Sequence, residues 1–403
     1  MASLVMARAV GKIAMTMKKR ASVTLIVETS GVYGRQILHG VSRYLNTHGG
    51  WSVFVDEREG MAPPPKWLLD WNGDGIICRS TTPSLAHALK KRRIAVVDLN
   101  ERYGYLGLPY IASDMPAIGR MATEHLLERG FKNIAYAGFS EPQWSKGRLK
   151  GVQEALHGRG QLCSVFESPT NVYRTKNWLD ERNRICEWVQ TLPRPIGIVA
   201  CNDRRGQHVL EACRMLGVSV PDEISVVGVD NTETLCELCS PPLSSVMPDA
   251  ERIGFEAATL LARLMEGDSK AEAQTERISI APREVVARQS SEVWAIDDPV
   301  FSRAIRFIRE HACDRITVDD VLAHARTSRS TLERSIRHHL GHSPQTEIRI
   351  IRLKRVKQLL EETSFSLPRI AEIAGFEHPE YMMAQFKRLV GQTPSQWRES
   401  HLP

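Results

Sequence analysis

Short apolar strands alternate with amphipathic helices from residue 22 to about residue 288, and this alternation restricts the fold more than any other feature. The strand-like runs are residues 23–28, 51–56, 74–78, 94–99, 133–137, 196–200 and 224–229. Apolar residues at helical spacing lie between them, as over 31–45 and 83–92. Continuous apolar strands separated by such helices predict parallel sheets that are covered on both faces. Because roughly 265 residues exceed one doubly wound domain, we expect two α/β lobes.

The strand pattern ends near Arg288. The segment RQSSEVWAIDDP is polar and aperiodic and ends in Pro299, so residues 288–298 are predicted to form a linker. Beyond it, apolar residues recur at helical spacing to residue 398, which predicts a separate all-helical domain. The expected organisation is a tail at 1–20, a two-lobed domain at 21–287, the linker, and a helical domain at 299–403.

The net charge of +6 is unevenly distributed over the 403 residues. Residues 1–20 carry five Lys and Arg and no acidic residue, a net +5. Residues 299–403 carry 17 Lys and Arg against 12 Asp and Glu, again +5, which leaves −4 on residues 21–298. A basic helical domain favours a polyanionic partner. The basic N-terminus is expected to be a disordered tail or the result of a start codon placed too early.

Eight scattered cysteines are too few for a disulfide scaffold, and the CxxC of Cys236 and Cys239 has no second pair to complete a zinc site. We therefore expect reduced thiols, no metal and no cofactor. The N-terminus lacks the apolar core of a signal peptide, and no run of 18 apolar residues could span a membrane. A cytoplasmic location without a membrane partner is expected. The sequence also lacks a GxGxxG after a strand, a P-loop, a GxSxG elbow and an HExxH motif, so no catalytic residue is assigned and an enzyme is not expected.

The helical domain contains an internal repeat. SRSTLERSIRHHLGHSP (328–344) and HPEYMMAQFKRLVGQTP (378–394) align with an offset of 50, so Gly341 matches Gly391. Each copy follows a short apolar helix and a turn, and Ser328 is placed to cap the second helix of the first copy. The repeat predicts two helix-turn-helix units, at about 317–341 and 367–391.

A helix-turn-helix unit presents the outer face of its second helix to the major groove of double-stranded DNA. Arg334 is the best candidate for reading a base, because a guanidinium pairs with guanine through two hydrogen bonds. Ala384 matches Arg334 in the repeat, so the second unit is expected to read fewer bases. The alternative is that these are ordinary solvated helix faces. The candidate DNA-binding residues are Arg329, Ser330, Thr331, Arg334, Arg337, His378, Glu380, Tyr381, Gln385, Lys387 and Arg388.

Polar residues at the ends of the predicted strands indicate a ligand site in the α/β body. Asp203 and Asp230 each follow a strand, and Glu28 follows another. The carboxyl ends of parallel strands face the ligand crevice of such sheets. Carboxylates, a guanidinium and aromatic rings suit a polyhydroxylated ligand, since carboxylates accept hydroxyl protons and Arg donates to oxygen.

Tyr33, Trp144 and Arg148 are the expected aromatic and cationic members of this site, and Arg35 is a weaker candidate. Some of these residues have structural alternatives. Asp203 and Asp230 could cap helices, Asp114 could start one, and Trp144 could fill a lobe interface.

The helical domain resembles the AraC-type DNA-binding domain. The resemblance lies in RLKRVKQLL, in IAEIAGFEHPEYMMAQFKRLVGQTPSQWR and in the first copy of the repeat. It implies two units, joined by a long helix at about 345–362, that enter successive major grooves. Two positions depart from the pattern, because Arg326 stands where the first turn usually has Gly and Ile336 replaces a Phe.

The α/β body resembles the regulatory core of LacI/GalR-type repressors, which is similar to periplasmic sugar-binding proteins. IASDMPAIGRMATEHLLERGFKNIAYAG, IGIVACNDRRGQHVLEACRMLGVSVPDEISVVGVDN and PPLSSVMPDAERIGFEAATLL carry this resemblance. It implies a two-lobed, periplasmic-binding-protein-like sensor with parallel sheets. It also implies that Arg148, Asn202, Asp203 and Asp230 occupy ligand-contacting positions.

The combination of the two domains resembles the bacterial regulators of D-xylose operons, as do ETSGVYGRQILHGVSRYL and DPVFSRAIRFIREHAC. This resemblance implies a homodimeric, xylose-responsive activator that recruits RNA polymerase to an operator. A repressor, or a regulator that responds to a hexose, a nucleoside or a sugar phosphate, remains an alternative. A sugar-modifying enzyme with a helical appendage is the rival from another class.

Overall fold

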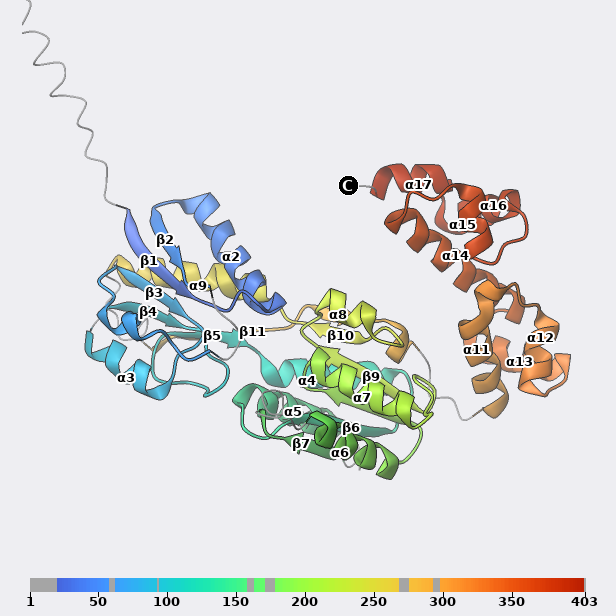
Figure 1. The fold of residues 1–403 in the computed structure, drawn as a ribbon, viewed down its shortest axis with the longest axis horizontal. Helices are drawn as coiled ribbons and strands as arrows, with labels where there is room; N and C mark the ends of the chain where they lie inside the picture. The colour runs from blue at the N-terminus through green and yellow to red at the C-terminus, as the bar shows by residue number, and fades with distance from the viewer. Residues whose placement is uncertain are drawn as a thin grey trace, which may run out of the picture. The chain divides into compact units, whose positions relative to one another are not determined.

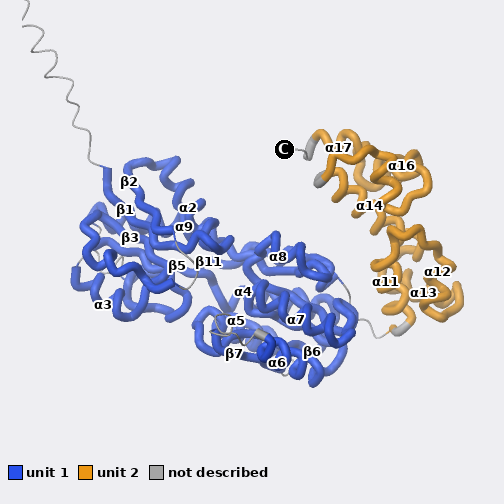
Figure 2. Tube along the Cα trace, in the orientation of Figure 1, with its two compact units in different colours: residues 1–294 blue, residues 295–403 orange. Residues whose placement is uncertain are grey.

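The computed structural model describes residues 20–57, 62–92, 94–157, 163–170, 178–267, 275–292 and 298–401. The chain divides into two compact units, residues 1–294 and 295–403, shown in different colours in Figure 2. The first unit holds two parallel-sheet lobes and the second is helical, as the sequence predicts (Figure 1). The predicted tail lies outside the described residues, apart from Arg20.

The N-terminal lobe is built on a six-stranded parallel sheet with strand order β11-β5-β4-β3-β1-β2. Side chains that alternate along the strands enter two separate cores, so that Ile77 packs under α2 and α9 whereas Ile76 packs under α3. This two-sided burial is the reason that the strands are continuously apolar. The elements are β1 (Ala21–Ile26), α2 (Val32–His48), β2 (Trp51–Val55), the 3-10 helix η1 (Lys66–Asp70), β3 (Gly75–Cys78), α3 (Pro83–Arg92), β4 (Ala95–Asp98), β5 (Tyr110–Ser113), α9 (Ala250–Met265) and β11 (Arg277–Ile280).

The C-terminal lobe has the strand order β12-β10-β9-β8-β6-β7, and its strands are parallel except for β12, which is antiparallel to β10. Helix α4 packs closely on α5, where Gly119 and Gly151 each leave no room for a side chain against the opposing backbone. The elements are α4 (Met115–Glu128), β6 (Asn133–Phe139), α5 (Gln143–Leu156), β7 (Cys163–Ser168), α6 (Trp178–Thr191), β8 (Ile196–Ala200), α7 (Asp203–Met215), β9 (Ile224–Val229), α8 (Glu233–Leu238), β10 (Ser244–Met247) and β12 (Glu284–Val286).

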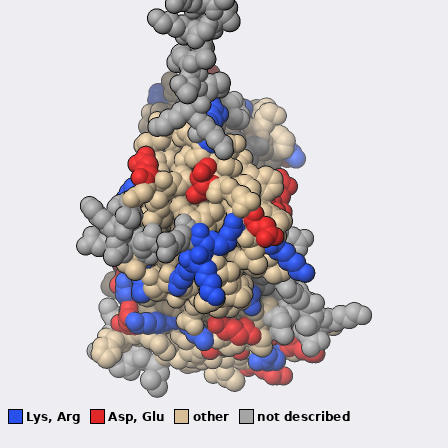
Figure 3. Space-filling view, turned by 90° about the vertical axis from the view of Figure 1, so that its left-hand side faces the viewer, with Lys and Arg blue, Asp and Glu red and all other residues tan. Residues whose placement is uncertain are grey.

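The chain passes between the lobes after β5, between β10 and α9, and between β11 and β12. Backbone hydrogen bonds join these crossings: the amide of Asp114 donates to the carbonyl of Ile280 at 2.8 Å, and the amide of Arg283 donates to that of Met247 at 2.9 Å. Each lobe is thus assembled from separate stretches of chain. Figure 3 shows a group of Lys and Arg side chains near the middle of one face of the N-terminal lobe, with Asp and Glu side chains around it.

The segment expected as a linker begins inside the first compact unit. Residues 289–291 form a 3-10 helix, η3 (Gln289–Ser291), with Ser290 and Ser291 fully buried. The Ser290 hydroxyl donates to the carbonyl of Val226 at 2.6 Å, and the Ser291 hydroxyl lies 2.7 Å from that of Ser244. Because both residues are polar, this buried segment resembles a solvated loop in the sequence. The body therefore extends to Glu292, and residues 293–297 lie outside the described residues.

His125 contacts this same segment and predicts a pH dependence of stability. Its Nε2 lies 2.8 Å from the Ser291 hydroxyl, and burial followed by the charge of Arg129 lowers the pKa of His125 to about 4. Between pH 6.5 and pH 4, His125 binds a proton in the unfolded chain but not in the folded protein. The free energy of unfolding therefore falls as the pH falls. We expect His125→Gln to remove about 2 kcal/mol of the loss between pH 6.5 and 4.5. Thermal unfolding of the wild-type and variant proteins across this pH range measures the difference. If both proteins lose stability equally as the pH falls, His125 is not the group responsible.

The helical unit contains two cores that share one long helix. Helix α14 contributes Ile348 to the first core, and Val356 and Leu360 to the second. Leu332 and its repeat partner Met382 are both fully buried, one in each core. The helices are α11 (Pro299–His311), α12 (Val318–Ala325), α13 (Arg329–Leu340), α14 (Pro344–Glu362), α15 (Leu367–Ile373), α16 (Pro379–Val390) and α17 (Pro394–His401), with a 3-10 turn η4 (Ala312–Asp314).

The turns of the two helix-turn-helix units contain a predicted helix cap and two residues with left-handed backbone. Ser328 caps α13 by accepting from the amide of Thr331, as expected. Arg326 has a φ of 50°, and Gly375 at the corresponding turn of the second unit has a φ of 77°. A left-handed residue is usually Gly because it lacks a Cβ, so Arg326 holds a position that Gly would occupy with less strain. Ile336, the other departure, is fully buried in the first core.

Candidate functional site

Arg148 and Asp230 form the polar centre of the C-terminal lobe. Arg148 lies on α5 and is only 3% exposed, and its guanidinium donates to the carboxylate of Asp230 at 3.3 Å and to the carbonyl of Cys201. Burial opposes the charge of Arg148, but the carboxylates of Asp230 and Glu101 raise its pKa. Burial raises the pKa of Asp230 although Arg148 lowers it. The guanidinium also lies 5.1 Å from the centre of the Trp144 ring, which is half-buried.

A second polar cluster gathers at the strand ends of the N-terminal lobe. Arg79, after β3, pairs with Glu28 and, at 3.1 Å, with Glu101, which follows β4. The Tyr33 hydroxyl donates to Glu101 at 2.6 Å and lies 2.7 Å from the hydroxyl of Ser113, at the end of β5. Burial and the charge of Glu101 raise the pKa of Tyr33 well above its ordinary value. Tyr33 and Glu28 therefore lie in one network, as the sequence suggests.

The two clusters meet where α5 begins. The first amides of α5, on Gln143 and Trp144, donate to the carbonyls of Arg102 and Glu101 in the other lobe at 2.9 and 3.0 Å. These bonds satisfy helix amides that have no partner within the helix. They also place Glu101 close enough to Arg148 and Asp230 for its charge to influence both.

Several buried polar atoms at this junction lack a partner among the residues that the structure describes. They are the Nε atoms of Arg79 and Arg148 and the side-chain oxygen of Asn231. A buried donor or acceptor without a partner is costly and points to a ligand or a bound water. Two donors and one acceptor, beside carboxylates and an aromatic ring, match the hydroxyl groups of a sugar.

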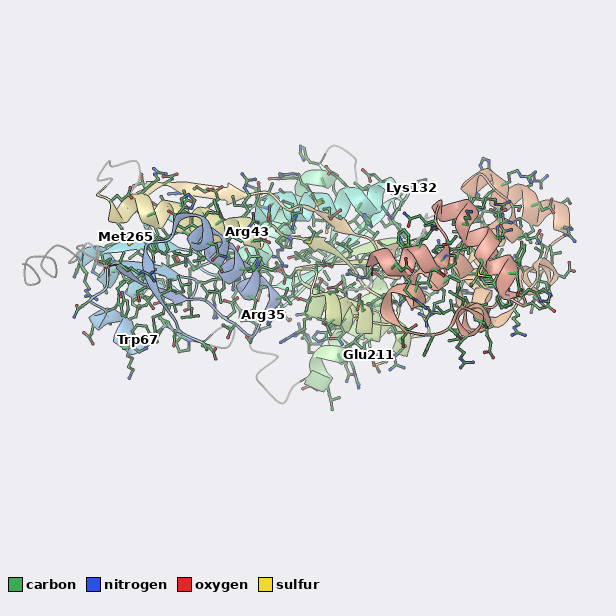
Figure 4. All side chains as sticks on the ribbon, turned by 90° about the horizontal axis from the view of Figure 1, so that it is seen from above. Arg35, Arg43, Trp67, Lys132, Glu211 and Met265 are labelled. Atoms are coloured by element: carbon green, nitrogen blue, oxygen red, sulfur yellow. The ribbon has the colours of Figure 1, made fainter. Side chains whose placement is uncertain are left out.

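The other predicted ligand residues have defined positions. Asn202 caps α7 by accepting from the amide of Arg205 at 2.9 Å. Asp203 is buried beside it and caps no helix, and Asp230 caps none either. Asp114 starts α4, where it accepts from the amide of Ala117 at 2.8 Å. Arg35, labelled on α2 in Figure 4, is exposed and donates to the carbonyls of Thr29 and Ser30, so it holds its own turn and does not join the cluster.

Four residues of the site were not among the sequence candidates: Arg79, Glu101, Ser113 and Asn231. Each one ends a strand or follows one within three residues, which is the signal that also marks Asp230. The strand-end rule identifies them when it is applied to 75–78, 95–98 and 110–113 and extended to the second residue after 224–229. Residues 110–113 were not among the predicted strands.

The outer face of α13 carries the first set of DNA-binding candidates. Arg334 and Arg337 are exposed, and neither is paired with a carboxylate within the described ranges. They line a surface hollow together with Ser330, Glu333 and His338. Arg329, in contrast, lies 3.6 Å from Asp319 and 3.5 Å from Glu333. Thr331 is held against Ser328, with their hydroxyls 2.9 Å apart, so it supports the start of the helix.

The second helix-turn-helix presents a different set of side chains. The exposed candidates are His378, Glu380, Tyr381, Lys387 and Arg388. Gln385 is half-buried, and its side-chain oxygen is enclosed without a hydrogen-bond partner in the described part of the chain. Ala384 is exposed at the position equivalent to Arg334, so this face lacks the guanidinium of the first unit.

All eight cysteines are free, including Cys236 and Cys239. Over the described ranges, no group of three or more His, Cys, Asp or Glu residues is arranged to hold a metal ion. None of the helices in these ranges is both long and apolar enough to cross a membrane.

Comparison with known proteins gives matches over most of the chain. Residues 22–116 match the XylR N-terminal domain, residues 123–291 a periplasmic binding protein-like domain, and residues 321–400 a helix-turn-helix domain. The xylose operon regulatory protein of Escherichia coli K12 is 31% identical over 389 residues, which cover 94% of this chain and 97% of the relative. The protein of the same name from Haemophilus influenzae is 31% identical over 93% of this chain and 97% of its own length.

Solved structures agree with these matches. The structure of the xylose-binding transcription activator XylR superposes with a TM-score of 0.77 at 30% identity, covering 96% of this chain and all of the other. The complex of the transcriptional regulator CelR with cellobiose has a TM-score of 0.54 at 23% identity and covers 70% of this chain and 89% of its own. The second likeness concerns the fold of the sensor alone.

Proposed function

Since the chain belongs to the family of xylose operon regulatory proteins and is a sugar-responsive transcription regulator, we propose that D-xylose is its effector and binds at the junction of the two polar clusters. The observation that carries this site is the set of buried, unpartnered donors on Arg79 and Arg148 beside the carboxylates of Glu101 and Asp230. Xylose is an uncharged polyol, and neutral hydroxyls satisfy such donors and acceptors without adding charge.

The roles of the residues follow from their chemistry. Asp230 and Glu101 accept hydroxyl protons, while the Nε atoms of Arg148 and Arg79 donate to sugar oxygens. Trp144 offers an aromatic face, and Tyr33 holds Glu101 in place through the 2.6 Å hydrogen bond. Because these groups come from both lobes, a sugar that binds both favours the closed arrangement of the lobes by its differential affinity.

The helical unit binds the operator DNA. Arg334 reads a base in one major groove, whereas Arg337, Lys387 and Arg388 neutralise phosphates. The protein acts as a homodimer in the cytoplasm, so that closure of the sensor changes how two helical units meet two operator half-sites. It activates transcription by recruiting RNA polymerase to the genes of xylose catabolism. No catalytic step is assigned to it.

Thermal unfolding with a panel of sugars tests the effector. A ligand that binds only the folded state raises the melting temperature in proportion to the logarithm of its concentration. We expect D-xylose at about a hundred times its Kd to stabilise the protein by about 2.7 kcal/mol. D-ribose, L-arabinose and D-glucose are the competing sugars, and mannitol controls for osmolyte effects. A larger shift with another sugar would reassign the effector, and no shift with any of them would refute the site.

A further inference from the structure

Asp203 is buried near enough to Asp230 for their charges to interact, and each of its carboxylate oxygens accepts a hydrogen bond from the protein. The residue begins α7 and is 2% exposed. One carboxylate oxygen accepts from the amide of Thr232 at 2.7 Å, and the other accepts from the hydroxyl of Ser245 at 2.5 Å. Neither partner lies on α7, so the carboxylate joins the start of that helix to the loop after β9 and to β10.

The loop that Asp203 holds has an unusual backbone. Asp230 has a φ of 104° and Asn231 a φ of 45°, both in the left-handed region that residues with a Cβ rarely adopt. Such conformations persist only where neighbouring groups fix them. The amide of Asn231 donates to the Ser245 hydroxyl at 3.0 Å, and that hydroxyl donates to Asp203. Asp203 thus reaches the loop twice, directly at Thr232 and through Ser245 at Asn231.

Strand β9 leaves room for this carboxylate. A Cβ added to Gly228 would lie 2.5 Å from the Oδ1 atom of Asp203, which is closer than atoms of neighbouring groups can approach. The glycine is therefore needed for the carboxylate to sit against the strand. Gly228 gives a second way to displace Asp203 without changing Asp203 itself.

We propose that Asp203 is a positioning residue, which fixes the left-handed turn at Asp230 and Asn231 and so aims their side chains at the sugar, rather than a residue that contacts the sugar. The role rests on the sugar site proposed above. It is an alternative to the direct ligand contact that the family resemblance implies for Asp203, because each carboxylate oxygen accepts a hydrogen bond from the turn or from β10. Precise ligand placement depends on supporting groups of this kind.

The electrostatics of Asp203 indicate which variant preserves its role. Burial and the nearby charge of Asp230 raise the pKa of Asp203 to about 7, so its neutral acid is accessible at physiological pH. Asparagine has the shape of that neutral acid. In Asp203→Asn the side-chain oxygen still accepts from Thr232 and the amide nitrogen donates to Ser245, so the turn is held without the charge.

Calorimetric titration of the full chain with D-xylose tests the proposal. We expect Asp203→Ala and Gly228→Ala to weaken binding by about tenfold to a hundredfold, the range for loss of hydrogen bonds to a charged group. Asp203→Asn should lose less than about threefold, because it retains both hydrogen bonds. A residue that contacts the sugar would lose affinity in Asp203→Asn as well as in Asp203→Ala, and that result would overturn the proposal.

A double-mutant cycle separates positioning from a general loss of structure. In the background of Asp230→Asn, titrated with sugar up to millimolar concentration, Asp203→Ala should weaken binding by less than about threefold, since the effects of interacting residues are not additive. An undiminished cost would show that Asp203 acts independently of Asp230 and would refute the proposal.

Amide hydrogen exchange without sugar distinguishes this proposal from the proposed function. Asp203→Ala should speed exchange at Thr232, whose amide loses its acceptor, while Asp203→Asn should not. If the wild-type protein binds no sugar, the proposed function is wrong. If exchange at Thr232 is unchanged in Asp203→Ala, the positioning role is wrong, whether or not the protein binds sugar.

Discussion

Replacing Asp230 with alanine is expected to abolish the response to D-xylose while basal DNA binding survives. The change removes the carboxylate that accepts sugar hydroxyls, and it leaves the guanidinium of Arg148 buried without its 3.3 Å partner. Two hydrogen bonds to a charged acceptor contribute about 3–6 kcal/mol together, so affinity should fall by roughly a hundredfold or more. Calorimetry with D-xylose measures the loss, and fluorescence anisotropy with operator DNA measures the DNA binding that remains.

Glu237→Ala is the matched control for Asp230→Ala. Glu237 is an exposed carboxylate on α8 in the same lobe, so its removal changes the net charge equally without touching the site. It should leave sugar affinity unchanged. An Asp230→Ala protein that still responds to xylose like the wild type would remove Asp230 from the site and, with it, the arrangement proposed here.

Arg334→Ala is expected to lose about 1–3 kcal/mol of DNA-binding free energy at one position of the operator and to relax the base preference there. Arg334 is exposed on α13 with no carboxylate partner in the described residues, so its guanidinium is free to pair with a guanine. Selection of DNA duplexes from a randomised library, with the wild-type and variant proteins, locates the position and measures the change.

Arg337→Ala provides the contrast, since it removes a guanidinium one turn further along the same exposed face. A phosphate contact weakens binding to all sequences alike and lowers the dependence on salt concentration by about one ion. If Arg334→Ala weakens operator and random DNA equally, Arg334 is a phosphate contact and the base-reading assignment is wrong.

The sequence predicts elements best where residue type and burial agree. Strand β8 (IGIVA) is fully buried and apolar, so its sequence alone identifies it. Strand β10 (SSVM) is also buried, but Ser244 and Ser245 satisfy groups elsewhere in the lobe, and an apolar-run criterion cannot find it. The same reason hides Ser290 and Ser291, which the sequence places in a linker. In the helical domain the repeat marks both units, because equivalent core positions keep their apolar character.

Some of the proposed ligand residues could be brought together from the sequence, and others could not. Asp230 and Arg148 were expected and lie together, since each has a charge that only a partner or ligand explains. The surroundings of the Asp203 carboxylate depend on Ser245, 42 residues away in the sequence, and on the space left by Gly228. The sequence alone therefore does not distinguish a residue that positions the turn from one that contacts the sugar. Arg35 lies near the start of the expected helix, but its guanidinium donates to the carbonyls of Thr29 and Ser30 in the preceding turn. The sequence does not show this local contact.

The most direct test of the account is the affinity of the full-length protein for operator DNA with and without saturating D-xylose. If sugar and DNA binding are coupled as proposed, xylose should tighten operator binding by a factor of about 5–150, and operator DNA should tighten xylose binding by the same factor. An operator affinity that is identical with and without bound xylose would contradict the account.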